Sequence, residues 1–274
     1  MLNGRRVAIL GTGTMGRALG MGLVSSGTVA PSAITGTVKH AAELEASRGL
    51  VSFDLSLDNA GAVAGADVVL LCTKPRSARG VLAELAEAGA LDHDPLLISI
   101  CAGVSTAALQ SACGDKARVV RAMPNTPCQI GEGMTVVAPG LRATTEDLET
   151  ALTIFRPLGR ALQLDEEHMN TVTGLSGSGP AFVYVIIEAL SEGGVMMGLP
   201  RSVATELAAQ TVKGAARMVL ETGRHPAALK DDVTTPAGCT ISALLLLEDG
   251  RLRSVLARGV QEAARSAAGL GSES

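Results

Sequence analysis

The sequence predicts a chain of two parts, an α/β domain over residues 1–164 followed by an all-α domain over residues 165–274. In the first part, short apolar runs of strand type alternate with helical patterns, as in a parallel sheet covered by helices on both faces. After Leu164 the strand signals stop, and the later segments have helical periodicity.

The first strand and helix flank a glycine-rich turn. Arg6–Leu10 reads as a strand and Arg17–Ser25 as a helix. The six residues between them are Gly11, Thr12, Gly13, Thr14, Met15 and Gly16. In this G-x-G-x-x-G pattern the glycines permit a tight turn, close approach to a pyrophosphate and close helix–strand packing. We therefore expect a Rossmann-type domain with these six residues at a dinucleotide; a purely structural turn is the alternative.

The end of the second strand, expected at Ala33–Thr37, bears on the choice of cofactor. A site selective for NAD usually has Asp or Glu here to hold the ribose 2′-OH. Thr37 and Lys39 stand there instead, and a hydroxyl and a cation suit a 2′-phosphate. The sequence thus favours NADPH, and NADH is the alternative cofactor. The alternative interpretation of Lys39 is that it is only the solvated start of the next helix.

Further strands are expected at Asp67–Thr73, Pro95–Ile100, Val119–Met123, Gly133–Ala138 and Ala161–Leu164, with a helix over Thr145–Leu158. Ligands in such sheets bind beyond the carboxyl ends of the strands, so the loops after the first three of these strands should border the cofactor. The residues that we expect there are Thr73, Lys74, Pro75, Ala102, Gly103 and Asn125. Ordinary loop chemistry is the alternative for each.

Helices are expected in the second half at Ala181–Met197, Ser202–Thr222, Ala227–Val233 and Arg251–Leu270. The first is apolar on almost all sides, which predicts a position at the centre of its bundle. A helical domain this apolar also suits an interface with a second subunit.

A turn rich in threonine precedes the apolar run Ile241–Leu247. It contains Thr234, Thr235, Pro236 and Gly238. The threonine hydroxyls are expected to cap the next helix. The start of that helix offers N–H groups and a partial positive charge to a small carboxylate, to which Thr240 can add a hydroxyl. An ordinary capped turn is the alternative.

Composition argues against several classes of partner. A net charge of −4, no Trp and one Tyr give no reason to expect nucleic acid or an anionic membrane surface. The longest apolar run, Ala181–Ile187, is too short to span a bilayer, and we expect no targeting peptide before the first strand. Five cysteines without C-x-x-C spacing predict reduced thiols and a cytoplasmic location, and no metal site is expected.

Several motifs, in order, resemble those of the Δ1-pyrroline-5-carboxylate reductase family. The most specific is Asp232–Ile241 (DVTTPAGCTI), continued by Leu247-Glu248. Supporting motifs are Lys74-Pro75, Val119–Pro127, Leu175–Ala181 and Leu199–Arg201. The resemblance covers nearly the whole chain. It implies an oxidoreductase with a Rossmann domain and a helical dimerisation domain, assembled as a homodimer or a higher homo-oligomer such as a decamer. The implied reaction is the reduction of 1-pyrroline-5-carboxylate to L-proline with NADPH, the last step of proline biosynthesis.

The resemblance also implies roles for single residues. Thr240 looks like the catalytic residue that hydrogen-bonds the ring nitrogen. The substrate carboxylate is then held around Thr235, Gly238, Cys239 and Thr240. Ser176 and Gly177 are expected to form the floor beneath the nicotinamide and the substrate.

The chain departs from the family pattern at three places. Ala237 stands where glycine is common, Cys239 where a small Thr, Ser or Ala is usual, and Thr37 to Lys39 replace an Asn-Arg pair. Two alternatives stay open: a sister enzyme, such as a β-hydroxyacid dehydrogenase or an F420-dependent NADP reductase, and a non-enzymatic NADP-binding regulator. The dehydrogenase would need a catalytic lysine within Asp165–Pro180, which contains none.

Overall fold

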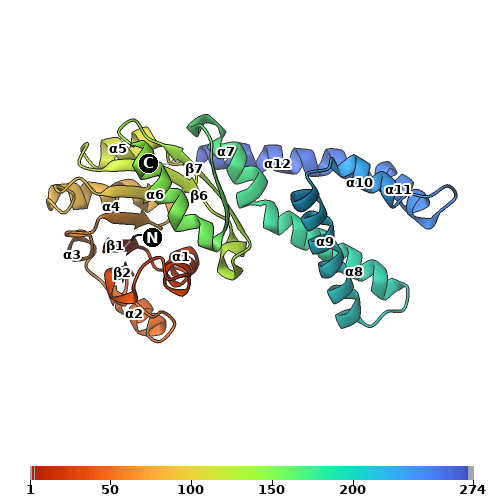
Figure 1. Cartoon of the computed structure of the whole chain (residues 1–274), viewed down its shortest axis with the longest axis horizontal. Coiled ribbons are helices and arrows are strands. Elements are labelled where there is room, and N and C mark those ends of the chain that lie inside the picture. Colours follow the sequence, from red (N-terminus) through yellow and green to blue (C-terminus); the bar gives the residue numbers. More distant parts are fainter. Residues whose placement is uncertain (1, 3, 271–274) are drawn as a thin grey trace. The chain divides into compact units, whose positions relative to one another are not determined.

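An eight-stranded sheet forms the centre of the first part of the computed structural model, which describes residue 2 and residues 4–270 (Figure 1). Its strands are β1 (Val7–Leu10), β2 (Ile34–Thr37), β3 (Asp54–Ser56), β4 (Val68–Leu71), β5 (Leu96–Ser99), β6 (Arg118–Met123), β7 (Gly133–Pro139) and β8 (Gly159–Gln163). The spatial order is β3-β2-β1-β4-β5-β6-β7-β8. Strands β1 to β6 run parallel, β7 pairs antiparallel with β6, and β8 runs parallel with β7. The first six strands have the order of a dinucleotide-binding sheet, which confirms the predicted Rossmann class.

Six helices cover the two faces of this sheet. They are α1 (Thr14–Ser25), α2 (Ala41–Ser47), α3 (Asn59–Val63), α4 (Pro75–Glu87), α5 (Thr106–Ala112) and α6 (Thr145–Phe155). The last helix was expected to reach Leu158 but ends at Phe155, followed by a 3₁₀ turn over Arg156–Leu158. The reason is Pro157, which has no N–H for the helical hydrogen-bond ladder.

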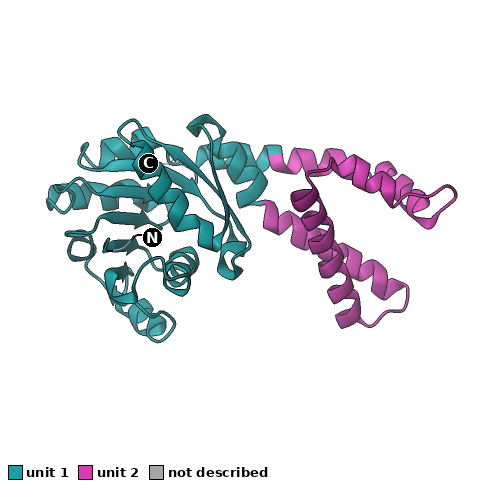
Figure 2. Cartoon of the chain, viewed as in Figure 1, with its two compact units in different colours: residues 1–178, 261–274 teal, residues 179–260 magenta. Residues whose placement is uncertain are grey.

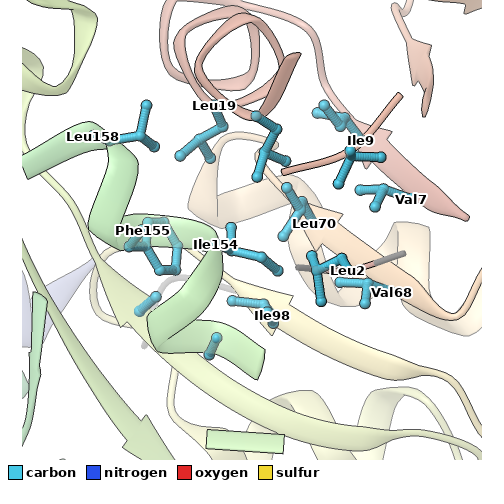
Figure 3. Packing of buried hydrophobic residues seen from close by; sticks show 14 of the residues in the cluster. Leu2, Val7, Ile9, Leu19, Val68, Leu70, Ile98, Ile154, Phe155 and Leu158 are labelled. Carbon is cyan, nitrogen blue, oxygen red and sulfur yellow. The ribbon is translucent and has the colours of Figure 1, made fainter. Parts of the chain in front are cut away.

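Alternate residues of the strands feed two apolar cores, one on each face of the sheet. On one face Ile9 and Leu70 pack with Leu19 of α1 and with Phe155 of α6 (Figure 3). On the other face, apolar side chains of the same strands pack with α4 and α5, for example Leu82. Full burial of each large side chain stabilises the fold by about 1.5–3 kcal/mol. These cores fix the end of β1, from which the glycine-rich turn departs.

The rest of the described chain, up to residue 270, is mostly helical, as predicted. A continuous helical stretch consists of α7 (Met169–Val172), a π-helical turn η5 (Thr173–Gly177) and α8 (Gly179–Met196). It is followed by α9 (Arg201–Thr222), α10 (Pro226–Asp232), α11 (Cys239–Asp249) and α12 (Leu252–Gly269). The chain divides into two compact units, residues 1–178 with 261–274 and residues 179–260 (Figure 2). The expected division between residues 164 and 165 stays a prediction.

Helix α8 differs from its expected position at the centre of a bundle. Among the described side chains of this helix, Ser191 alone is buried, so the prediction is wrong for the single chain. Tyr184 and Val185 are more than half exposed. The apolar pattern was correctly identified, but most of the surface that would cover it is not supplied by its own unit.

Among the described residues, one helical stretch is both long and apolar enough to reach across a bilayer. It is Glu166–Met196, which has 31 residues and contains an 18-residue window with a mean hydropathy of 1.2. A core helix of a soluble protein can have the same length and composition, so this stretch is weak evidence for a membrane span.

Candidate active site

The glycine-rich turn is shaped by close backbone contacts. Gly11 has φ +93°, and a Cβ added there would lie 3.0 Å from the Cys72 carbonyl oxygen. A Cβ added at Gly16 would lie 2.3 Å from the Gly11 carbonyl oxygen. Both positions therefore require glycine for the packing of the protein itself.

Gly13 differs from these two glycines, because a Cβ added there would meet no described atom within 4 Å. Gly13 is the N-cap of α1, and in the described structure no side chain caps this helix and no acid stands in its first turn. The N–H groups at the helix start are thus available to an anion, and the space above Gly13 is open. This arrangement fits the pyrophosphate of a dinucleotide, with Thr14 exposed and Met15 half-buried beside it.

Thr12 and Thr37 hold the turn from behind. The Thr12 backbone N–H and hydroxyl both donate to the Thr37 carbonyl oxygen, at 2.7 and 3.0 Å, and the Gly11 N–H donates to the Thr37 hydroxyl at 3.4 Å. The side chains of both threonines are buried. Of the pair expected near the 2′-phosphate, Lys39 is therefore the exposed one. Its backbone N–H donates to Glu43 Oε2 at 3.1 Å, which brings a carboxylate to this end of β2.

Strand β3 was missed in the sequence, and with it the loop that follows. Because β3 runs parallel to β2, this loop lies at the same edge of the sheet. It contains the acid Asp58, whose carboxylate accepts from the Gly61 N–H at 2.9 Å and caps α3. Asp is a favoured residue at a helix N-cap, so Asp58 is the signal that indicates this helix start.

The loops after β4 and β5 lie where they were expected. Lys74 is the N-cap of α4 and Pro75 its first residue, while Gly103 has φ +75° in the loop after β5. The Cys101 thiol donates to the Thr73 carbonyl oxygen at 3.3 Å. Burial raises the pKa of the Cys101 thiol above its ordinary value, so this sulfur is neutral near pH 7.

A buried ion pair behind these loops was not found in the sequence. Arg121 of β6 has only 5% of its side chain exposed and lies 3.4 Å from the Glu166 carboxylate, and it also donates to Asn170 Oδ1 at 3.1 Å. The same carboxylate accepts from the Thr106 N–H at 2.7 Å and from the Thr106 hydroxyl at 2.5 Å. Burial lowers the pKa of Arg121, and Glu166 opposes this effect. A charged residue inside an apolar strand is the signal that indicates such a pair.

Asn125 connects three segments of the first unit. Its Nδ2 donates to the Ser176 carbonyl oxygen at 3.0 Å, and its Oδ1 accepts from the Met134 N–H at 2.9 Å. The predicted residues Asn125, Ser176 and Gly177 thus come together. A Cβ added at Gly177 would lie 2.9 Å from Met123 Cε, the flexible end of a side chain that packs beneath this turn.

The threonine-rich stretch forms a tight turn within the second unit. The Gly238 N–H donates to the Thr235 carbonyl oxygen at 3.0 Å, and Ala237 has φ +54°. With Pro236 at its second position, this is the pattern of a type II turn, whose third position favours glycine. The turn therefore forms with Ala237 in place of glycine, at some cost in backbone strain.

The expected hydroxyl cap of α11 is wrong. Gly238 is the N-cap, and no described side chain accepts from the first N–H groups. The Thr234 hydroxyl instead donates to the Lys230 carbonyl oxygen at 2.7 Å. A Cβ added at Gly238 would lie 2.5 Å from Thr235 Oγ1. The start of α11 is thus open, with Cys239 exposed and Thr240 half-buried in its first turn.

The described residues contain no group of three or more His, Cys, Asp or Glu side chains that could hold a metal ion. The five cysteines, all within the described residues, form no disulfide.

Comparison with known proteins gives concordant matches to the two parts of the chain. Residues 166–270 match the family described as pyrroline-5-carboxylate reductase dimerisation, and residues 6–103 match NADP oxidoreductase, coenzyme F420-dependent. Pyrroline-5-carboxylate reductase of Schizosaccharomyces pombe is 44% identical, over 96% of this chain and 98% of that protein. The Escherichia coli K12 protein of the same name is 39% identical, over 92% and 93%.

Solved structures of the same name share the fold over almost the whole chain. The Coxiella burnetii pyrroline-5-carboxylate reductase has a TM-score of 0.88 at 33% identity and covers 98% of this chain and 99% of that one. The Plasmodium falciparum pyrroline carboxylate reductase with NADP bound has a TM-score of 0.89 at 28% identity, with 98% of both chains covered.

Proposed function

The chain belongs to the pyrroline-5-carboxylate reductase family, and from this premise we propose that it reduces 1-pyrroline-5-carboxylate to L-proline with NADPH, as the last step of proline biosynthesis. The observation that carries the proposal is the open start of α11, which has Thr240 in its first turn, no side-chain cap among the described residues and no acid in that first turn. The substrate has a carboxylate next to a C=N bond, so one anion-binding helix start and one hydroxyl match its two polar groups.

The cofactor is held by the residues of the first unit. Gly11–Gly16 and the start of α1 take the pyrophosphate, and Lys39 faces the 2′-phosphate of NADPH. The loops at Thr73–Pro75 and Ala102–Gly103 border the rest of the dinucleotide. When bound, the reduced nicotinamide supplies the hydride. Glu43 places a negative charge near Lys39, so we expect a modest preference for NADPH and measurable activity with NADH.

The substrate is oriented by the second unit. The N–H groups at the start of α11, with Thr235, Gly238 and Cys239 around them, hold the carboxylate. The Thr240 hydroxyl forms a hydrogen bond with the ring nitrogen. As the imine carbon receives the hydride, the nitrogen becomes an amine and takes one proton from solvent, which balances the reaction. The protein thus contributes binding and orientation.

Thr240→Ala tests this role. Loss of one oriented hydrogen bond costs about 1–3 kcal/mol, so turnover should fall about ten- to a hundredfold without disappearing. The assay is the loss of reduced-nicotinamide absorbance with pyrroline-5-carboxylate and NADPH or NADH. Thr205→Ala is the matched control, because the Thr205 hydroxyl donates only to the Arg201 carbonyl oxygen of its own helix. Unchanged kinetics in Thr240→Ala would exclude the role of Thr240.

The carboxylate site has a separate test. Proline should inhibit the enzyme far better than pyrrolidine, which lacks the carboxylate. Equal inhibition by the two would contradict a carboxylate at α11. If cofactor binds but pyrroline-5-carboxylate is not reduced, a sister enzyme or a non-enzymatic regulator becomes the better interpretation.

We also propose that the second unit forms a homodimer, on which a decamer can be built. Large apolar side chains on its helices are widely exposed in the single chain, among them Met196 at 83%, Met197 at 81% and Leu246 at 73%. A patch of this kind marks an interface. Light scattering should show at least twice the 27.8 kDa of one chain, and a monomer would refute the proposal. A cytoplasmic location stays a prediction from the thiols.

A further inference from the structure

The π-helical turn η5 lies at Thr173–Gly177 and is followed by Ser178, Gly179 and Pro180. Its register is shown by the Ser178 N–H, which donates to the Thr173 carbonyl oxygen five residues earlier at 2.8 Å. Single π-helical turns inside longer helices occur frequently at functional sites. The turn carries Ser176 and Gly177, which are assigned to the floor of the proposed active site.

Pro180 removes one hydrogen bond from the junction of this turn with α8. Helix α8 begins at Gly179, and in its α-helical register the carbonyl oxygen of residue 176 would accept from the N–H of residue 180, which proline lacks. A half-buried carbonyl group without a donor is costly. The side chain of Asn125 supplies a donor, with Nδ2 at 3.0 Å from the Ser176 carbonyl oxygen.

The other end of the Asn125 amide is fixed as well. Its Oδ1 accepts from the Met134 N–H at 2.9 Å, at the start of β7. Strand β7 is in turn joined to α7 by the apolar contacts of Val136 and Ala138 with Met169 and Val172. Two interactions thus connect the π-helical turn to the sheet: the apolar packing of α7 on β7 and the hydrogen bonds of the Asn125 amide.

We propose that Asn125 is a positioning residue, which replaces the hydrogen bond that Pro180 cannot give to Ser176 and thereby fixes the π-helical turn at the active site. This assignment rests on the proposed function, and it differs from the direct cofactor contact expected from the sequence. Both polar atoms of the amide are engaged with backbone groups. Asn125 therefore acts on the reaction through the position of Ser176 and Gly177.

The test is a double-mutant cycle between residues 125 and 180. Asn125→Asp keeps an oxygen for the Met134 N–H but places a carboxylate opposite the Ser176 carbonyl oxygen. We expect kcat to fall about tenfold or more, while KM for NADPH changes less than about threefold. Pro180→Ala restores an N–H at position 180. In that background the loss caused by Asn125→Asp should shrink to about threefold or less, because Ser176 regains a donor within the helix.

Gln129→Glu is the matched control, since it introduces the same charge on the 3₁₀ turn Thr126–Ile130, where the Gln129 amide donates to the Thr126 carbonyl oxygen. It should leave kcat unchanged. Hydrogen exchange of the peptide covering residues 173–182 gives a readout that does not depend on activity. Exchange should be faster in Asn125→Asp than in the wild type and slower again in the double variant.

Three results would overturn the proposal. One is an equal loss of kcat in both backgrounds, and another is an effect confined to KM for NADPH, which would make Asn125 a cofactor contact. The third is failure of both Asn125 variants to fold while Pro180→Ala folds. If the wild type does not reduce pyrroline-5-carboxylate, the proposed function fails, and the exchange rates still decide whether Asn125 fixes the turn.

Discussion

Substitution by alanine should have different effects at two glycines of the fingerprint: it should lower the stability of the protein at Gly16 and weaken NADPH binding at Gly13. At Gly16 the new Cβ would lie 2.3 Å from the Gly11 carbonyl oxygen and 3.2 Å from Ile9 Cγ2. A backbone oxygen cannot rotate away, so Gly16→Ala should lower the free energy of unfolding by about 3 kcal/mol, the upper part of the usual range for overpacking. At Gly13 the new Cβ meets no described atom within 4 Å.

Gly13→Ala should therefore leave the stability of the protein alone almost unchanged. Gly13 has φ −76°, which alanine adopts without strain. Alanine is a poorer N-cap than glycine but restricts the unfolded chain, and these two effects oppose each other within about 1 kcal/mol. The methyl group instead occupies the space assigned to the pyrophosphate. We expect NADPH to bind about a hundredfold more weakly, a loss of about 2.7 kcal/mol.

Thermal unfolding with and without NADPH separates the two effects. With NADPH at a hundred times the wild-type Kd, bound cofactor stabilises the wild type by about 2.7 kcal/mol but Gly13→Ala by only about 0.4 kcal/mol. Gly16→Ala should already unfold at lower temperature without cofactor. A full NADPH-induced shift in Gly13→Ala, or a destabilised Gly13→Ala without cofactor, would refute the assignment of this space to the pyrophosphate.

Four further substitutions, at three positions, test other features of the structure. Glu166→Gln should lower the free energy of unfolding in urea by about 3 kcal/mol, because it leaves the buried charge of Arg121 without its counter-ion. This is the lower end of the usual range, since the Glu166 side chain is 28% exposed; an unchanged midpoint would contradict the prediction. Burial alone would raise the pKa of Asp147, but hydrogen bonds from Thr144 and the Arg118 guanidinium bring it below the ordinary value. Its contribution is then present above about pH 4 and lost as the pH falls toward the lower folded pKa. The stability difference between wild type and Asp147→Asn should thus shrink below pH 4 in acid denaturation. Ala237→Gly should change the free energy of unfolding by no more than about 1 kcal/mol. Ala237→Val should raise KM for pyrroline-5-carboxylate, because β-branched residues disfavour the positive φ of this turn position. Equal kinetics in Ala237→Val and the wild type would contradict this.

The central strands β1, β4 and β5 could be predicted because they are buried on both faces and therefore read as continuous apolar runs. Strand β3 could not, since it has three residues at the edge of the sheet and none of them is fully buried. The class of the fold was thus predictable from patterns within short segments. The reversal of β7 was not, because strand direction depends on pairing partners and leaves no mark in a local pattern.

The parts of the site that were missed depend on contacts distant in sequence. Arg121 and Glu166 are 45 residues apart, and Asn125 and Ser176 are 51 apart. The sequence marks Arg121 as unusual because it is a charge in an apolar strand, and Asn125 because it is an amide between two prolines. It does not identify the partner of either residue. The predicted position of helix α8 was wrong for a related reason. Its apolar pattern indicates that another surface covers it, but the pattern does not indicate which chain supplies that surface.

The absence of the predicted hydroxyl cap at α11 agrees with the proposal that this helix start binds a ligand. Helices α3, α5 and α6 are capped by Asp58, Ser105 and Thr144, whose side chains accept from backbone N–H groups. Helices α1 and α11 have glycine at the N-cap and no described side chain that does so. A side-chain cap would consume one of the N–H groups that a phosphate or carboxylate needs. Helices α2, α4 and α9 also lack a side-chain cap, but their N-caps are His40, Lys74 and Pro200. The feature that α1 and α11 share is a glycine N-cap after a turn, and we take it as the signal of a helix start kept open for a ligand.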